Sequence, residues 1–414
     1  MLLKFLHLIL ILVVPGIVLA DVVGGSWHNS LYYYQDQLDT LHPDLNYYEN
    51  LNLYVKKIKA TNLSFYSNIN STNRFQQKTH RKANELSHLY LDWNEHGGKY
   101  DWKIGRFGFF EGIAPIFLDG AQAGWNVHEN WRLSAVAGLQ TPSRFSRDYI
   151  HVKKDSSSQV YFLKVAGNPW KKTQLGLSYQ HGIKGNDAMV SNVNLTGNQI
   201  ITKKIHSSGM LGYEINEAKV NEFLLQGFAD VTKKIQLGAQ VSLEDHTVDS
   251  SLFRDTLIYG KHYEAGLNAR YFFLKNADVM LSYDVRWLND WESSHQVNCW
   301  LNWNMVFLKY RQDFGEGGEC VKADAGLHVW RQPLLRVSAF VSGMRYQFSI
   351  LDDESQHVWM GSLRIGWKPF KLLQTNIELQ EISNKYYDYD TRVYVSTRMS
   401  LAKFYTMEGK KKKK

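Results

Sequence analysis

The chain has 414 residues, a mean hydropathy of -0.37 and a formal net charge of +8. The negative mean hydropathy excludes a helical membrane protein, whose spans each need about 20 consecutive apolar residues. The positive charge does not indicate a nucleic-acid partner. The run from Lys410 to Lys414 carries five of the eight charges, and such a terminal run is typical of a solvated tail.

The first 20 residues have the composition of a secretory signal peptide. Lys4 precedes an apolar run from Leu8 to Val14, and the segment closes with Val18-Leu19-Ala20. The apolar run is shorter than a membrane span, so cleavage before Asp21 is favoured over a membrane anchor. Residues 21–50 do not alternate between apolar and polar residues, and we expect them to form a periplasmic lead-in or a small plug.

From Leu51 onward, apolar residues alternate with small or polar ones. The clearest segment is Ile235 to Leu243, which is apolar at every odd position. Successive side chains of a strand point to opposite faces, so each such segment is a strand with one apolar and one polar face. Repeated strands of this kind are typical of a transmembrane β-barrel. The sequence predicts an all-β fold, a single transmembrane antiparallel up-and-down β-barrel over residues 51–404.

The connections between these strands differ in length. From Phe223 onward, tight turns such as Thr232 to Lys234 alternate with long polar segments such as Glu244 to Lys261. Outer-membrane barrels have short periplasmic turns, long extracellular loops and an even strand number. Counting Ala188 to Ile215 as two strands or as a loop gives about 18–20 strands, within a range of roughly 16–20. A barrel that wide can hold an aqueous lumen.

The aromatic content supports a membrane location. The chain has 13 Trp and 24 Tyr, which suit girdles at the two membrane interfaces. A secreted β-propeller or sandwich, the alternative fold, would instead bury these rings in a core. The last strand resembles the assembly signal of outer-membrane proteins, an alternating strand that closes in an aromatic residue, and places one row of residues on one face: Val393, Val395, Met399, Leu401 and Tyr405. Residues 405–414 form a basic tail that overhangs the usual end of such strands.

Strand parity assigns charged side chains to the polar face, which we expect to line the pore. The bases are Arg132, Arg270, Arg286, Lys309, Arg311, Lys322, Arg336, Arg364, Arg392 and Arg398, and the acids are Glu264, Asp284, Asp313, Asp324 and Glu378. This excess of bases predicts a wall that concentrates anions. The alternative is that these groups pair across strands and brace the wall. The sequence leaves both interpretations open.

No catalytic or metal-binding motif stands out. His181 and Ser207 are close in sequence, but no Gly-x-Ser-x-Gly or His-Glu-x-x-His motif is present. The acidic run Asp352 to Glu354 is typical of a solvated loop tip. We therefore predict no enzyme, no cofactor and no metal. Cys299 and Cys320 fall on non-neighbouring predicted strands, so we expect two free thiols.

One short stretch resembles a known family. Trp102-Lys103-Ile104-Gly105-Arg106, followed by Leu118-Asp119-Gly120-Ala121, looks like an early hairpin of alginate-export-like and other porin-type bacterial barrels. The resemblance implies a Gram-negative outer-membrane channel, surrounded by lipid, that passes small hydrophilic or anionic solutes. Phe107 stands where these families usually have Gln, so the solute class stays open. A barrel with a plugged lumen that serves as a binding or assembly scaffold is the alternative, and association into homo-oligomers is also open.

Overall fold

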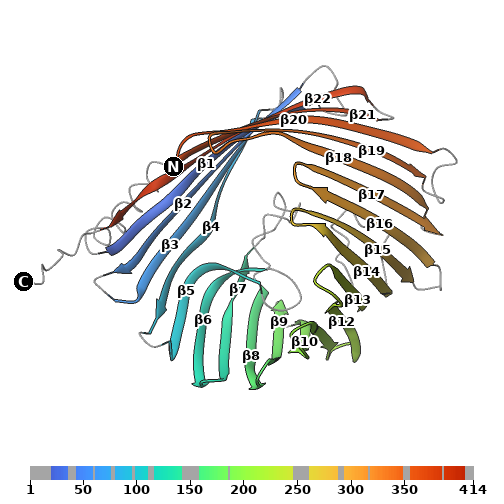
Figure 1. The fold of residues 1–414 in the computed structure, drawn as a ribbon. Coiled ribbons are helices and arrows are strands. Elements are labelled where there is room, and N and C mark those ends of the chain that lie inside the picture. Colours follow the sequence, from blue (N-terminus) through green and yellow to red (C-terminus); the bar gives the residue numbers. More distant parts are fainter. Residues whose placement is uncertain are drawn as a thin grey trace, which may run out of the picture.

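The protein is all-β and forms a closed, antiparallel 22-strand β-barrel. This computed structural model describes residues 20–405, except 36–42, 59–60, 76–79, 96–97, 111–115, 142–157, 185–186, 246–260, 288–292, 316–317, 348–354 and 385–386. Figure 1 shows the sheet as one continuous wall, with β22 (red) returning beside β1 (blue). Among the described residues, no helix has the length and apolar character needed to cross a membrane.

Every strand pairs with its neighbours in the chain, and β22 pairs with β1 to close the barrel. The strands are β1 Ala20–Gln35, β2 Pro43–Ile58, β3 Leu63–Phe75, β4 His80–Asn94, β5 Tyr100–Phe109, β6 Ile116–His128, β7 Trp131–Thr141, β8 Ser158–Trp170, β9 Thr173–Lys184, β10 Asp187–Ile200, β11 Ile205–Glu214, β12 Lys219–Asp230, β13 Ile235–Glu244, β14 His262–Leu274, β15 Ala277–Trp287, β16 Ser293–Trp303, β17 Val306–Gly315, β18 Glu319–Arg331, β19 Leu335–Gln347, β20 Gln356–Phe370, β21 Leu373–Asn384 and β22 Tyr387–Tyr405.

The strand count and the N-terminal segment differ from the sequence prediction. The expected range of about 16–20 strands is too low for two reasons. Residues 21–35 form β1 and residues 43–50 begin β2, rather than a lead-in or plug, and the stretch from Leu51 to Asn68, which the alternation count takes as one strand, is divided between β2 and β3. Alternation is hidden in β1, where Asn29 interrupts the apolar row of Trp27 and Leu31. These residues nevertheless share a face, since Trp27 lies opposite Leu51 and Met399. The segment from Ala188 to Ile215 does form two strands, β10 and β11.

Because the strand number is even, both ends of the barrel chain lie at one rim. We call this rim, which holds Ala20 and Tyr405, the terminal rim, and the opposite one the loop rim. Connections at the terminal rim are tight. Lys172 and Asn304 there adopt left-handed φ values of 72° and 51°, as two-residue hairpins favour. The longest connections, 142–157 and 245–261, join strands at the loop rim. The predicted asymmetry is therefore present, although 316–318 and 385–386 break the strict alternation of lengths.

The two faces of the wall differ in the way that a membrane barrel requires. On the apolar face, Leu267 and Leu281 are 64% and 53% exposed, whereas Asn70 and Asn192 on the polar face are 3% and 0% exposed. A water-soluble protein has the reverse distribution, and lipid covers exposed apolar bands in outer-membrane barrels. Because the wall is a single closed sheet, a propeller or sandwich is excluded.

Exposed aromatic side chains gather toward the two rims. Near the terminal rim these are mostly tryptophans: Trp125, Trp131, Trp170, Trp303, Trp330 and Trp367. Toward the loop rim they are mostly tyrosines: Tyr161, Tyr179, Tyr213, Tyr263 and Tyr283, together with Trp359. Amphipathic rings of this kind favour headgroup depth. The two sets form the girdles that the composition predicted.

Candidate functional site

The strand register places all the charged residues assigned by parity on one face, the polar face. Glu264 lies opposite Arg286, Arg311 lies opposite Lys322, and Arg364 lies opposite Glu378. Residues directly opposite in an antiparallel pair project from the same side of the sheet. Large exposed residues such as Leu267 and Leu281 occupy the other side.

Seven of the ten predicted bases form ion pairs with acids on this face. The contacts are Arg132–Asp101 at 2.6 Å, Arg270–Asp278 at 2.9 Å, Arg286–Glu264 at 2.9 Å, Arg311–Asp313 at 2.8 Å, Lys322–Asp324 at 3.5 Å, Arg392–Asp390 at 2.6 Å, and Arg364 with Glu378. Of the two interpretations that the sequence left open, pairing that braces the wall therefore accounts for most of these groups.

Three of the paired acids were missed by the sequence reasoning. Asp101, Asp278 and Asp390 each lie just before the first residue that alternation assigned to a strand, whereas the structure includes all three in β5, β15 and β22. The parity rule would have placed them correctly if the strands had been extended by one to a few residues. With them included, the excess of bases over acids is much smaller than predicted.

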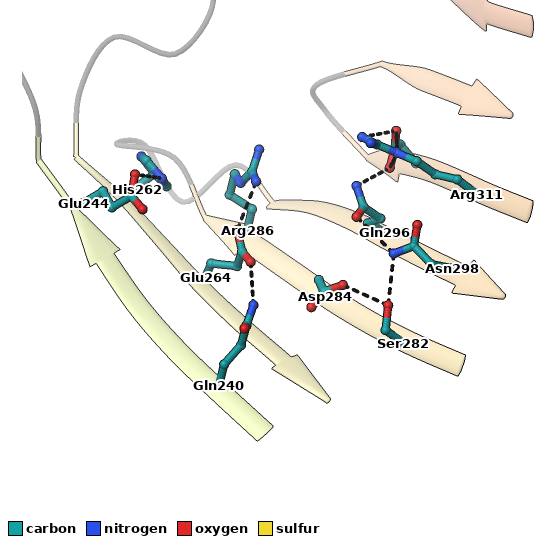
Figure 2. Close-up of polar contacts among 11 residues, drawn as sticks. Gln240, Glu244, His262, Glu264, Ser282, Asp284, Arg286, Gln296, Asn298 and Arg311 are labelled. Atoms are coloured by element: carbon teal, nitrogen blue, oxygen red, sulfur yellow. Dashed lines mark hydrogen bonds and ion pairs between the residues drawn. The ribbon is translucent and has the colours of Figure 1, made fainter. Parts of the chain in front are cut away.

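Polar side chains of β13 to β17 form two groups of hydrogen bonds on this face (Figure 2). Arg286 Nη2 donates to Glu264 Oε2 at 2.9 Å, and the other carboxylate oxygen accepts from Gln240 Nε2 at 3.0 Å. In the second group, Asn298 Nδ2 of β16 donates to Ser282 Oγ of β15 at 3.0 Å, and this hydroxyl donates to Asp284 Oδ2 at 3.2 Å. The network holds the charged groups in fixed positions along the face.

A hollow of about 480 Å³ opens beside this network. Its lining carries both signs of charge, including Arg286, Arg311, Asp284 and Glu319. Cys320 also borders it. Groups of both signs that are held by hydrogen bonds can offer donors and acceptors to a passing hydrophilic solute.

Three predicted bases have no acid partner among the described residues: Lys309, Arg336 and Arg398. The Lys309 ammonium lies 5.3 Å from the centroid of the Trp300 ring, in a cation–π contact. Arg398 borders a second hollow, of about 500 Å³, together with Ser26, Asn52 and Tyr54. Among the ten predicted bases, these three are the ones for which the described residues form no ion pair.

The polar face also carries an apolar cluster that sequence reasoning missed. Phe107 and Leu118 lie opposite each other on β5 and β6 and are 1% and 0% exposed. Phe109, Ile116, Val136, Val160 and Phe162 complete the cluster with them. The sequence could have revealed this cluster, because Val160 and Phe162 occupy the alternate positions of β8 that parity assigns to the polar face. Arg106 and Asp119, which alternate with Phe107 and Leu118 in the porin-like hairpin and so lie on the other face of the sheet, form an ion pair at 2.5 Å.

The weaker catalytic and metal candidates do not assemble. His181 Nδ1 lies 2.8 Å from Ser191 Oγ on β10, whereas Ser207 is on β11 and opposite Gln199. The Asp352–Glu354 run lies outside the described residues. Within the described part of the chain, no group of three His, Cys, Asp or Glu residues could hold a metal ion. Cys299 and Cys320 are free and lie on the non-adjacent strands β16 and β18, as predicted.

Comparison with known proteins supports the fold and assigns no family. No protein-family profile and no curated protein sequence match the chain. Among solved structures, the translocation pore of the P pilus usher PapC aligns with a TM-score of 0.52 and 7% identity, over 92% of this chain and 99% of that one. OpdQ and OprD of Pseudomonas aeruginosa align with TM-scores of 0.44 and 0.42, each at 9% identity over 92% of this chain and 99% and 96% of theirs.

At these identities the likeness concerns the fold alone. The chain has the closed β-barrel fold of Gram-negative outer-membrane proteins, and its exposed apolar face fits that membrane location. The likeness of the β5–β6 hairpin to alginate-export-like barrels remains a resemblance.

Proposed function

We propose that the protein is an outer-membrane channel for passive or weakly selective diffusion of small hydrophilic solutes. The observation that supports this most directly is a closed 22-strand wall with one polar face. Eight strands enclose only enough space for their own side chains, and wider barrels leave an aqueous lumen. In this proposal the polar face lines the lumen, and the apolar face contacts outer-membrane lipid.

The proposed channel favours anions modestly. Lys309, Arg336 and Arg398 have no acid partner among the described residues, so they contribute positive potential along the wall. The seven ion pairs contribute little net charge, because each couples one base to one acid. Salt screens exposed charges beyond roughly 8 Å at physiological strength. A few-fold preference is therefore expected rather than strict selectivity.

A second candidate is a barrel with an occluded lumen that serves as a binding or assembly scaffold. It is favoured by the apolar cluster around Phe107 and Leu118, whose members are almost fully buried although they lie on the polar face. Apolar residues on a freely hydrated wall would be exposed, and known 22-strand outer-membrane transporters have a plugged lumen. We rank this candidate below the channel, because the cluster occupies only β5 to β8.

The proposal involves no catalytic step, cofactor, metal or nucleic acid. Its partners are membrane lipid, small hydrophilic solutes and the assembly machinery that would recognise β22 as the closing strand. Homo-oligomers are compatible with it.

Conductance in a planar bilayer tests the channel directly. Purified protein should give stepwise conductance, and a salt gradient should produce a reversal potential of the sign expected for modest anion preference. Protein heated before reconstitution serves as the negative control. A folded, inserted protein that gives no conductance would support the scaffold instead.

A further inference from the structure

The tyrosine Tyr54 lies on the polar face in an unusual position, over a glycine of the neighbouring strand. A Cβ atom at Gly24 of β1 would lie 2.5 Å from the Tyr54 hydroxyl oxygen and 2.6 Å from Cζ of its ring. The two residues are directly opposite in the register. Glycine thus lets the ring lie across β1, beside the hollow of about 500 Å³ described above.

Tyrosines continue this row across the sheet. Tyr66 lies opposite both Tyr54 and Tyr90, and the rings of Tyr66 and Tyr90 stack with centroids 4.9 Å apart. Lys56 lies over the rings of Tyr54 and Tyr66, and Lys103 lies over Tyr90 and Phe107. The ammonium groups of Lys56 and Lys103 are therefore engaged with aromatic faces.

One step toward the loop rim, the same strands carry uncharged amides. Asn50 donates to Asn68 at 3.0 Å, Asn52 donates to Asn50 at 2.6 Å, and Asn68 donates to Asn52. Asn52 and Ser26 lie opposite each other and both border the hollow. The amide network is continuous from β2 to β3 and reaches β1 through Asn52 and Ser26, 3.5 Å apart.

The lining of the hollow combines an aromatic ring with groups that both donate and accept hydrogen bonds. Ser26, Asn52 and Ser400 offer both functions, and Arg398 and Lys371 offer donors only. Sugar hydroxyls both donate and accept hydrogen bonds and can therefore use both functions of this lining, whereas a carboxylate only accepts and leaves the acceptor oxygens of Asn52, Ser26 and Ser400 unused. The C–H face of a pyranose is apolar and fits an aromatic ring. The volume lies within the roughly 300–1,000 Å³ typical of ligand pockets.

From this arrangement we infer that the hollow beside Tyr54 is a binding site for neutral saccharides on the channel wall. The inference rests on the proposed function, because it assigns a solute class to the channel. Tyr54 stacks against a sugar ring, Asn52 and Ser26 bind its hydroxyl groups, and Arg398 donates to hydroxyl or ring oxygens. The neighbouring Tyr66–Tyr90 pair extends the aromatic surface along the wall.

Titration calorimetry in detergent tests binding without requiring an open pore. The probe is maltotriose, with tetraethylene glycol as a flexible neutral comparator and trigalacturonate as an anionic one. Maltotriose should bind, and Tyr54→Ala should raise its Kd by roughly three- to tenfold. Tyr54→Phe should retain most of the affinity, because the ring is kept. Asn52→Leu should weaken binding, because it removes the amide.

Phe307→Ala is the matched control. The Phe307 ring lies over Gly326 of β18 in the same manner, with a would-be Cβ 1.9 Å from the ring, but it lies outside this sector. This variant should bind maltotriose like the parent protein, and heat-modifiable gel mobility should show that every variant is folded.

Maltotriose binding no stronger than that of tetraethylene glycol would overturn the inference, as would tighter binding of trigalacturonate or equal losses in Tyr54→Ala and Phe307→Ala. Conductance without saccharide binding would support the proposed channel function and reject only the saccharide site. Binding without conductance would reject the channel and retain the site.

Discussion

The ion pair between Arg132 and Asp101 spans a strand that belongs to neither residue. Arg132 is on β7 and Asp101 is on β5, and their Nη2 and Oδ2 atoms are 2.6 Å apart. Gly124 of the intervening β6 lies beneath them. A Cβ atom there would be 2.1 Å from Arg132 Nη2 and 2.7 Å from Asp101 Oδ2. The absence of a side chain at Gly124 thus allows one ion pair to connect three strands.

Gly124→Ala should therefore destabilise the barrel modestly. The methyl group would displace the flexible end of Arg132 rather than backbone, and the Arg132 side chain is 39% exposed, so the loss should not exceed about 1 kcal/mol. Urea unfolding in lipid vesicles measures it. Gly361→Ala is the control, because nothing lies within 4 Å of its Cβ position, and it should be neutral or stabilising.

A double-mutant cycle identifies the cause of that loss. In an Asp101→Asn background the pair is already broken, so the effect of Gly124→Ala should shrink. An undiminished loss of stability in that background would show that Gly124 is required by the backbone conformation rather than by the ion pair.

The two faces of β14 should respond oppositely to a new charge. Leu267 is 64% exposed on the apolar face, so Leu267→Arg should cost ~2–4 kcal/mol where no water solvates the guanidinium. Asn268, the next residue, is on the polar face opposite Ser282, and Asn268→Arg should be tolerated. Equal losses in the free energy of unfolding would mean that the assignment of faces is wrong.

Strand faces were predictable from sequence where both faces are chemically distinct. The alternation from Ile235 to Leu243 gave almost the full extent of β13, Ile235–Glu244. β1 was missed, because Gly25 and Asn29 interrupt its apolar row and Tyr32 and Tyr34 place aromatic rings on its polar face. A period-two signal weakens when residues of both kinds occur on one face.

The partners of the charged residues were not predictable in the same way. Parity gives the face of Arg364, but only the register shows that Glu378 lies opposite it on β21. Register depends on the lengths of turns and on bulges, which alternation does not reveal. For Arg132 even the neighbouring strand would have been the wrong place to look, since its acid is two strands away.

The modest anion preference of the proposed channel should depend on the unpaired bases. Replacing both Arg336 and Arg398 by Ser should bring the anion-to-cation permeability ratio from roughly a few-fold toward unity, as measured by reversal potential in a salt gradient. Arg364→Ser should also reduce the ratio, because it leaves the Glu378 carboxylate without its partner.

The matched control for these variants removes a whole pair. Arg364→Ser combined with Glu378→Ser changes the net charge by zero and should leave the reversal potential near that of the parent. Cation preference in the parent protein, or a potential unmoved in the Arg336 and Arg398 double variant, would contradict the assigned selectivity.

The two free thiols lie on opposite faces, and their labelling distinguishes an aqueous lumen from an occluded one. Cys320 borders the hollow beside Arg311 on the polar face, whereas Cys299 lies opposite Leu281 and Tyr310 on the apolar face. A small, anionic, membrane-impermeant thiosulfonate should react with Cys320 and lower the single-channel conductance, because it adds bulk and negative charge to the wall. The Cys320→Ser variant should be unaffected, and Cys299→Ser should behave like the parent. Labelling of Cys299 instead would reverse the two faces, and no reaction at Cys320 in folded protein would favour the occluded scaffold.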